Sequence, residues 1–366
     1  MTYLTQYRYT TGAVTELFDD VVHPQKANWY PETYKRAKSG LIYPPHKMVD
    51  MLLDEEFVTE IRESKFGKTA FILAAGNSHF AGINQRTHKP NRLIYEYKFL
   101  PLTLTQVYAG RTAQAFGAHD LIMTDATACV SGMKAFYDAH NLLENRGFER
   151  VVVLAIEDQV NNSVLEFFGD AKACLTWEEE QKGVVPSAFD SHNGGFYVAQ
   201  GAAVAVFERN PREEPMAQVV GCGLSSEECT NAMGQREDGE GYIRAIEEAL
   251  WEMNTDPREI SVIKTHGTGT KSNNIAERNA IETVFKDFVA TSYKPSIGHT
   301  MGVSGLMETC MLLDDMGIGK IPGIANRTEK DERFLSEDIE DQEGLILSLA
   351  AGMGNIYSAV ILDRRA

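Results

Sequence analysis

The chain has 366 residues, of which 43% are hydrophobic and 24% are charged, and its formal net charge is −17 at pH 7. These values are ordinary for a globular protein and exclude the disordered and fibrous classes. The negative charge disfavours nonspecific binding to nucleic acids or to anionic membranes. No apolar run is long enough to span a bilayer, and the N-terminus lacks the features of a signal peptide, so we expect a cytoplasmic protein.

The first 65 residues are hard to interpret because prolines divide them into short pieces, and only residues 48–61 have a helical pattern. From Thr69 onward, buried strands alternate with helices, which is typical of an α/β domain with a largely covered sheet. The elements expected here are a strand at residues 70–74, a helix at 104–116, a strand at 121–123, a helix after Cys129, and strands at 151–156 and 202–207.

A second run of the same kind begins near Ala217. Its expected elements are a helix around residues 243–253, a strand at 261–264, helices at 275–288 and 303–313, and strands at 345–349 and 358–362. We interpret the acidic stretch 329–343 as a solvated excursion between elements. The sequence therefore predicts two α/β halves of similar size, residues 1–210 and 211–366.

The cysteines and two of the histidines give no sign of a metal centre. The five cysteines are scattered and odd in number, which is not typical of a disulfide framework. None forms a Cys-x-x-Cys pair, and Cys222 and Cys229 have no pair of histidines nearby, so zinc is not expected. His79 and His88 flank a loop-like stretch without a further ligand at suitable spacing. We interpret both as surface or structural residues.

Cys129 stands between a short strand and a helical pattern, in the segment Asp-Ala-Thr-Ala-Cys-Val-Ser-Gly. A thiol at a helix N-terminus faces the positive end of the helix dipole and unpaired N–H groups, which stabilise its thiolate. This placement suggests covalent catalysis by a nucleophile that is reactive near neutral pH. The alternative is a cysteine that only packs as a small buried hydrophobe.

Two histidines of the second half, His266 and His299, lie in segments rich in glycine and hydroxyl side chains. Each is expected where a strand or loop meets a helix, and Gly302 and Gly305 would permit tight packing beside His299. Because sites in open α/β sheets form beside strand ends, both histidines are expected to converge on Cys129. A lone histidine in such a place would more often be structural.

Such a set of side chains has a clear chemical use. A thiolate can capture an acyl group as a thioester, while two imidazoles that donate hydrogen bonds stabilise a carbonyl oxygen as it becomes an enolate. This is the chemistry of a Claisen condensation. Lys294 could hold a nearby charge or orient His299, and Glu277 could accept a hydrogen bond there; the alternatives are a surface lysine and a solvated glutamate.

With these motifs, the chain resembles the β-ketoacyl-acyl-carrier-protein synthases of the elongating Cys-His-His kind, in the thiolase-like superfamily. The resemblance runs in the family's order from about residue 69 to the end. It is carried by residues 127–132, 266–270 and 294–305, with further agreement at 188–196, 201–203, 321–326 and 352–354. It implies a thiolase-like α/β fold whose two similar halves stack in five layers, αβαβα.

The resemblance also implies roles for the matched positions. Cys129 would take an acyl chain from a phosphopantetheine thioester, and its backbone N–H, with that of Met353, would form the oxyanion hole. His266 and His299 would stabilise the enolate that forms when a malonyl thioester loses carbon dioxide. The product would be a β-ketoacyl thioester in fatty-acid or polyketide-type synthesis, so the chain would be an acyltransferase.

The remaining matched positions would support this reaction. Thr268 and Thr270 match the hydroxyls that bind the pantetheine arm, and Lys294, Glu277 and Asn274 match the charge network around the histidines. Met353, between Gly352 and Gly354, stands where the family has a gating phenylalanine. The resemblance implies no resident cofactor, an acyl carrier protein as partner that docks on a local basic cluster, and a homodimer.

Several positions depart from the family's pattern. Asn274 replaces an aspartate, Gln200 replaces a glutamate, Met353 replaces the gating phenylalanine and Asn355 replaces a glycine of the gate. The family's glycine-rich opening strand is missing, and residues 7–14 are interpreted as a degenerate version of it. We therefore expect a compact, divergent member with an altered substrate entrance.

Other functions fit the sequence less well. A noncatalytic partner similar to a chain-length factor would usually lack the cysteine that this chain keeps. A thiolase or a priming synthase would need a second reactive cysteine or an asparagine in place of one histidine. A cysteine protease would leave the two histidine motifs unexplained.

Overall fold

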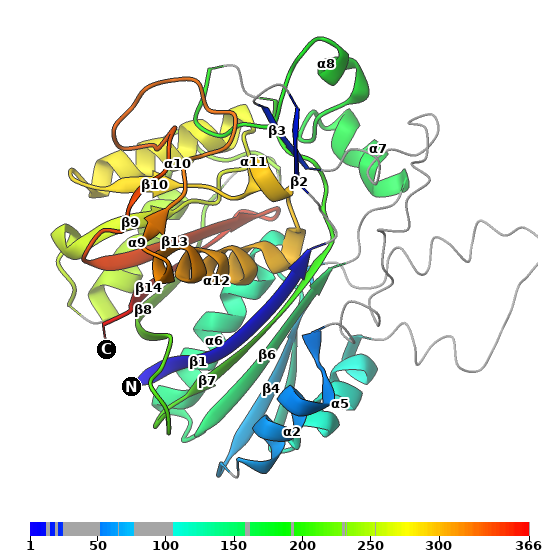
Figure 1. The fold of residues 1–366 in the computed structure, drawn as a ribbon, viewed down its shortest axis with the longest axis vertical. Coiled ribbons are helices and arrows are strands. Elements are labelled where there is room, and N and C mark those ends of the chain that lie inside the picture. The colour runs from blue at the N-terminus through cyan, green and yellow to red at the C-terminus, as the bar shows by residue number, and fades with distance from the viewer. Residues whose placement is uncertain are drawn as a thin grey trace, which may run out of the picture.

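A computed structural model describes residues 1–11, 15–18, 21–24, 52–64, 66–76, 105–157, 162–191, 194–228, 231, 233–252 and 254–365. Ten of its strands form one sheet: β1 (Thr2–Thr11), β4 (Thr69–Ala74), β5 (Leu121–Asp125), β6 (Arg150–Glu157), β7 (Gly201–Glu208), β8 (Ala217–Ser226), β9 (Ile260–Lys264), β10 (Val289–Thr291), β13 (Leu345–Gly352) and β14 (Ile356–Asp363). Their spatial order is β10-β9-β13-β14-β8-β1-β7-β6-β4-β5 (Figure 1).

The two halves of this sheet have the same topology. In each half, the five strands taken in chain order lie in the spatial order third, second, fourth, fifth, first. In each, the third, second and fourth strands are parallel, whereas the fifth runs antiparallel to its two neighbours. A short antiparallel pairing of β1 with β8 joins the halves. This repeat confirms the prediction of two similar α/β halves; the boundary near residue 210 stays a prediction.

The helices form three layers, and the two halves of the sheet form the two layers between them (Figure 1). The hydrophobic side chains of α6 (Ser131–Asn145) and α12 (Ser304–Gly317) share one central cluster with strands of both halves. Those of α2 (Glu55–Glu63) and α5 (Thr105–Phe116) cover the outer face of the first half, and those of α9 (Glu240–Glu252) and α10 (Lys271–Val284) cover that of the second. The expected five layers are therefore present.

Strands β4, β6 and β7 are runs of mostly apolar residues because both of their faces are covered. In β4, Ala70, Ile72 and Ala74 pack in the central cluster, while Phe71 and Leu73 pack under α2 and α5. The larger of these side chains, Phe71, Ile72 and Leu73, each contribute about 1.5–3 kcal/mol through removal from water. Alternation of polar and apolar residues is consequently absent from these strands.

Glycines let the two central helices come close together. A Cβ atom on Gly305 of α12 would lie 2.1 Å from Met133 Cγ of α6, and one on Gly132 would lie 2.8 Å from the Gly302 carbonyl oxygen. No larger residue fits either place without a shift of backbone or side chain. The close packing expected at Gly302 and Gly305 is thus observed.

Shorter elements complete the described chain. They are β2 (Thr15–Phe18), β3 (Val21–Pro24), α7 (Asn162–Asp170), α8 (Trp177–Gln181), α11 (Lys294–Ile297), β11 (Lys320–Ile321), β12 (Ile339–Glu340) and the 3-10 turns η2 (Ala128–Val130), η3 (Pro257–Glu259) and η4 (Met301–Val303). Within the part of the chain that the structure describes, none of the helices has the length and apolar character that a membrane span requires.

Three expectations need correction. The opening strand that was expected to survive only as a degenerate version at residues 7–14 is present as β1, which begins at Thr2. It lies in the middle of the sheet, although its sequence is largely polar, because its backbone pairs with β7 and β8 on both sides. Helix α10 ends at Val284, so Phe285 and Phe288 pack from the segment that follows. The acidic stretch 329–343 is only partly solvated, since Phe334 is fully buried and its ring centroid lies 4.5 Å from that of Phe189. Residues 48–51, His79 and His88 lie outside the described residues.

Candidate active site

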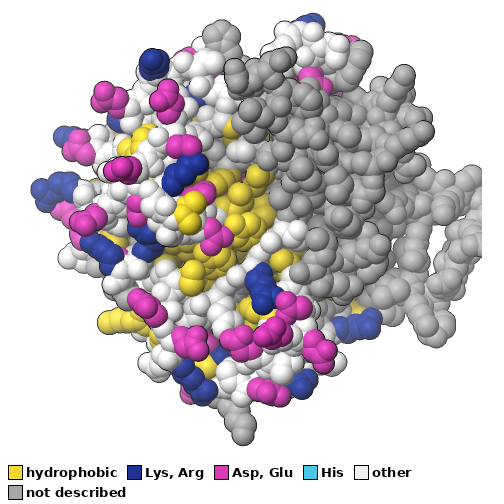
Figure 2. Space-filling view, in the orientation of Figure 1, with side chains coloured by type: hydrophobic (Ala, Val, Ile, Leu, Met, Phe, Trp, Pro, Cys, Tyr) yellow, Lys and Arg dark blue, Asp and Glu magenta, His cyan; other side chains and the backbone are white. Residues whose placement is uncertain are grey.

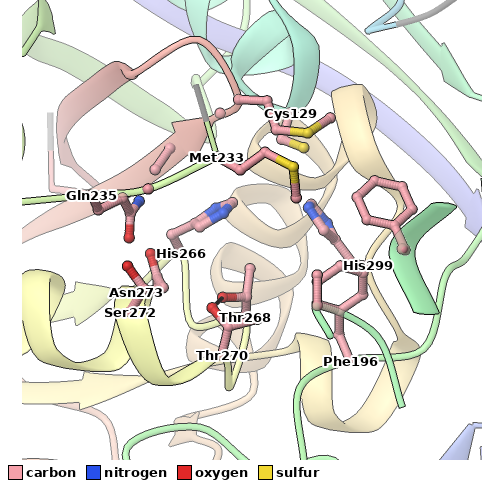
Figure 3. A pocket seen from close by; sticks show the side chains of 16 residues that line it. Cys129, Phe196, Met233, Gln235, His266, Thr268, Thr270, Ser272, Asn273 and His299 are labelled. Atoms are coloured by element: carbon pink, nitrogen blue, oxygen red, sulfur yellow. Dashed lines mark hydrogen bonds between the residues drawn. The ribbon is translucent and has the colours of Figure 1, made fainter. Parts of the chain in front are cut away.

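Cys129, His266 and His299 line one cavity of about 100 Å³ (Figure 3). Cys129 lies in η2 between β5 and α6, His266 follows β9, and His299 lies between α11 and η4. Cys129 and His266 closely follow the ends of β5 and β9, where sites in α/β folds form, and His299 lies in the loop after α11. The structure therefore brings together the three residues that the sequence singles out.

The turn that carries Cys129 is held by its own hydrogen bonds. Ala128 has a φ of 48°, in the left-handed region that residues with a Cβ rarely adopt. The Ser131 hydroxyl accepts a hydrogen bond from the Thr127 N–H at 2.9 Å and donates one to the Ala128 carbonyl at 2.7 Å. This turn places the thiol at the cavity wall immediately before α6.

The electrostatics of Cys129 differ from the expectation. The pKa of the Cys129 thiol is raised to about 12, mainly by burial and in part by the Glu157 carboxylate. Lys294 and the backbone N–H groups of Cys129 and Met353 lower this pKa without offsetting the burial. The prediction of a thiolate near neutral pH is therefore wrong for this cavity, because desolvation outweighs the helix dipole.

The two imidazoles face each other across the cavity. Their ring centroids are 5.4 Å apart with an interplanar angle of 84°, and both point toward Cys129 and Met233 (Figure 3). His299 packs edge-on against Phe196 at 4.9 Å, and its Nδ1 lies 2.9 Å from the Ser304 hydroxyl. Burial lowers the pKa of both imidazoles well below the ordinary value, and the charges of Lys294 and Lys264 lower it further. Both rings are consequently uncharged at neutral pH.

A buried charge network lies beneath these rings. Lys294 Nζ lies 2.8 Å from Glu308 Oε1, and Lys264 Nζ lies 3.3 Å from Glu308 Oε2. Glu277 instead accepts hydrogen bonds from the backbone N–H groups of His266 at 2.5 Å and Gly267 at 2.9 Å. The carboxylate that pairs with Lys294 is thus Glu308, which the sequence analysis missed.

The sequence contains an indication that Lys264 and Glu308 are buried and paired. Each is a charged residue inside an apolar run, Lys264 at the end of Ile-Ser-Val-Ile-Lys and Glu308 within Leu-Met-Glu-Thr-Cys-Met-Leu-Leu. A charge at such a place is buried only when it is paired. Both side chains are fully buried, and they pair with each other.

Of the five residues expected to bind substrate or support the histidines, two line the cavity. Thr268 and Thr270 do so, with their hydroxyl oxygens 3.0 Å apart. Asn274 is buried in α10 without being part of this wall, whereas its neighbour Asn273 is part of it. Gln200, the other departure near the site, is also buried.

The expected gate forms the mouth of the cavity. Gly352 and Met353 line it, and Gly354 has a φ of 87° in the turn between β13 and β14. Asn355 donates a hydrogen bond from its side chain to the Gly234 carbonyl at 3.1 Å. Through this bond the gate is attached to the segment that carries Met233, a lining residue that the sequence analysis did not identify.

Two family models match the chain. The N-terminal domain of beta-ketoacyl synthase matches residues 48–212, and the C-terminal domain of beta-ketoacyl synthase matches residues 216–328. Together these matches cover well over half of the chain, and both contain residues of the cavity. The chain belongs to the β-ketoacyl synthase family. The family expected from the motifs is thereby confirmed.

Individual members of the family are more distant. The chain is 28% identical over 251 residues to a 3-oxoacyl-[acyl-carrier-protein] synthase homolog of Saccharomyces cerevisiae, a match that covers 65% of this chain and 55% of that protein. The chain thus spans little more than half the length of the curated relatives it matches.

Solved structures confirm the fold. A type II polyketide ketosynthase in complex with its acyl-carrier protein has a TM-score of 0.80 at 16% identity, with 99% of this chain and 98% of that chain covered. A ketosynthase in complex with its chain length factor, from Xenorhabdus doucetiae, has a TM-score of 0.76 at 17% identity, with 99% and 97% covered. At these identities the likeness establishes the thiolase-like fold alone.

Proposed function

We propose that this chain is an acyltransferase that condenses an acyl group bound to Cys129 with a malonyl thioester, with loss of carbon dioxide. The observation that carries this proposal is the convergence of one cysteine and two histidines on a single cavity. Family membership supports it. The catalytic residues of the proposal are Cys129, His266 and His299.

In the first step, the Cys129 sulfur attacks the carbonyl carbon of an acyl thioester. A bond forms between this sulfur and the acyl carbon, the bond to the pantetheine sulfur breaks, and the thiol proton ends on the leaving sulfur. The N–H groups of Cys129 and Met353, which already face the sulfur, stabilise the oxyanion of the tetrahedral intermediate. Lys294 assists because its charge favours the thiolate.

In the second step, the malonyl carboxylate leaves as carbon dioxide, and the electron pair of the broken bond forms an enolate. His266 and His299 stabilise the enolate oxygen by N–H donation. The enolate carbon then attacks the Cys129 thioester, the carbon–sulfur bond breaks, and the released thiolate takes up a proton. The product is a β-ketoacyl thioester.

The partner of this reaction is proposed to be an acyl carrier protein, and the assembly a homodimer. A fold relative is described in complex with its acyl-carrier protein, and Thr268 and Thr270 are suitably placed for a pantetheine arm. On the described part of the face in Figure 2, Lys and Arg side chains alternate with Asp and Glu side chains and do not gather in one patch. The carrier's basic docking cluster is therefore proposed to lie outside this described part of the surface.

The proposal is tested with acyl carrier thioesters of several chain lengths. We expect a mass increase of one acyl group at Cys129, followed by carbon dioxide and a β-ketoacyl product when a malonyl carrier is added. Cys174→Ser, which changes another buried cysteine, is the matched control and should acylate normally.

Each negative outcome has a definite meaning. No acylation with any donor would contradict the condensing function and would favour the noncatalytic role of a chain-length factor. Acylation without decarboxylation of the malonyl donor would leave an acyltransferase whose histidines do not act in the proposed second step.

A further inference from the structure

Lys264 is a buried cation that is not needed to balance the charge of neighbouring Glu308. Glu308 has Lys294 as a partner at 2.8 Å, so its charge is already balanced. Lys264 adds a second ammonium group to the same carboxylate, with a side chain that is fully buried. A further buried charge costs free energy because it loses its hydration. Stability therefore does not explain this residue.

The position of Lys264 is fixed from two sides. Its Nζ donates a hydrogen bond to the Leu349 carbonyl of β13 at 2.8 Å and contacts Glu308 of α12 at 3.3 Å. Because Lys264 ends β9 two residues before His266, this anchoring sets the end of the strand from which that histidine emerges. The ammonium thus lies at a fixed place behind the cavity wall.

We infer that Lys264 is a positioning residue for the decarboxylation step, whose ammonium keeps His266 and His299 in their uncharged form. This inference rests on the proposed function. An uncharged imidazole retains a free nitrogen for its supporting contact while the other nitrogen donates to the enolate oxygen. A protonated imidazole would instead form an ion pair with the malonyl carboxylate and so stabilise the ground state that must lose carbon dioxide.

The charges around the two rings support this assignment. They come from Lys264 on β9, Glu277 on α10, Lys294 on α11 and Glu308 on α12, while neighbouring β10 and β13 carry no charged residue. Both lysines lower the pKa of His266 and of His299, after burial, which is the largest cause. Burial also lowers the pKa of Lys264 itself to about 8, so it remains charged in most molecules at neutral pH.

Lys264 and Lys294 differ in what else they influence. Lys294 also lowers the pKa of Cys129, whereas Lys264 is not among the groups that act on this thiol. Removal of Lys264 should therefore impair decarboxylation and leave acylation of Cys129 nearly unchanged. Removal of Lys294 should impair both steps.

The test compares Lys264→Met with the wild-type protein. Its charge is lost while Glu308 keeps Lys294, so the ion pair survives. We expect the pKa of both histidines, followed by NMR, to rise by on the order of one unit, as for loss of one nearby charge. In the pH–rate profile of malonyl decarboxylation, the apparent pKa of the acidic limb should rise by the same amount. The rate of acylation should change by less than about twofold.

Further variants separate charge from structure. Lys264→Gln keeps a donor for the Leu349 carbonyl without the charge and should behave like Lys264→Met; it also replaces that variant if the methionine disturbs folding. Lys264→Arg keeps the positive charge and should show the same pH dependence of decarboxylation as the wild-type protein. Lys320→Met removes a surface lysine that pairs with Asp338 and should change nothing.

Two results would overturn the inference. One is an active wild-type protein whose histidine pKa values and decarboxylation limb do not move in Lys264→Met and Lys264→Gln. The other is an equal loss of acylation and decarboxylation without a shift in pH dependence, as a merely structural role would produce. A wild-type protein that neither acylates nor decarboxylates would instead contradict the proposed function.

Discussion

The turn before α6 and the turn before α12 have the same backbone but different chemistry. Each is a three-residue 3-10 turn that leads directly into a long helix, and each contains a residue other than glycine in the left-handed region, Ala128 with a φ of 48° and Met301 with a φ of 49°. The next residue is Cys129 in the first half and Gly302 in the second. The repeated fold thus supplies the framework twice, and the side chains decide which copy reacts.

Gly302 is packed tightly against residues of the first half at the centre of the molecule. A Cβ atom there would lie 2.4 Å from the Gly76 backbone nitrogen. The Glu157 carboxylate accepts hydrogen bonds from the backbone N–H groups of Gly76 and Gly302. The second turn is therefore closed by residues of the first half. The second half contributes the histidines and most of the buried charges instead, which means that neither half contains a complete site.

The largest effect is expected from exchanging the two turns' side chains. Cys129→Ala should reduce acylation by at least about a thousandfold, the usual loss when a nucleophile is removed. Addition of Gly302→Cys to this variant should not restore it, because a side chain at Gly302 meets Gly76 and not the cavity. Mass spectrometry of the acylated protein gives both answers. Acyl transfer to a cysteine at position 302 would show that the turns are chemically interchangeable.

The next effect concerns the charges of the second half. The pKa of Lys264 is about 8 in the folded protein against an ordinary value of 10.5, so between these values the unfolded chain binds more protons than the folded one. The free energy of unfolding therefore gains about 3 kcal/mol from this group as the pH rises through that window. Lys264→Met should lack this gain. Denaturant unfolding of both proteins from pH 7.5 to 10.5 measures it; parallel curves would contradict it.

A smaller effect is expected where the two central helices meet. Gly305→Ala forces a methyl group against Met133 and should lower the free energy of unfolding by about 1–3 kcal/mol. Gly317→Ala lies on the same helix with open space around it and should leave stability unchanged or raise it by up to about 1 kcal/mol. Thermal and denaturant unfolding compare the two. Equal free energies of unfolding for the two variants would mean that α6 and α12 can move apart around the added methyl group without loss of stability.

The smallest effect tests the backbone that both turns share. Ala128→Gly removes the Cβ from a left-handed residue and should raise the free energy of unfolding by about 0.5 kcal/mol, since relief of strain exceeds the entropy that glycine adds to the unfolded chain. The neighbouring exposed Ala126 lies outside the left-handed region, and Ala126→Gly should lower stability by a similar amount. Destabilisation by both changes would contradict the strain at Ala128.

Much of the fold was predictable from the sequence because its strands are covered on both faces. Residues 70–74, 151–156 and 202–207 are short apolar runs between helical patterns, and each is a strand. Strand β1 was not predictable, since its pairing with β7 and β8 comes from backbone hydrogen bonds between segments far apart in the chain. Phe334 likewise gave no signal inside an acidic stretch, because its burial depends on distant Phe189.

The identity of the site residues was more predictable than their electrostatics. Local motifs pointed to Cys129, His266 and His299, and the structure places all three at one cavity. The raised pKa of Cys129 was not predictable, because desolvation depends on which distant residues pack around the thiol. The partner of Lys294 was also missed, since Glu308 reaches it only through the packing of α12 against the centre.

The pairing of β1 has a consequence for the order of events during synthesis. Residues of β1 are made long before those of β7 and β8, which follow roughly 200 residues later, about 10–40 s at ordinary translation rates. During that interval a segment with Tyr3, Tyr7 and Tyr9 has no sheet partner, and an unpaired strand edge of this kind is a place where chaperones bind or chains aggregate. Joining of the two halves through β1 must therefore follow the emergence of β8 from the ribosome.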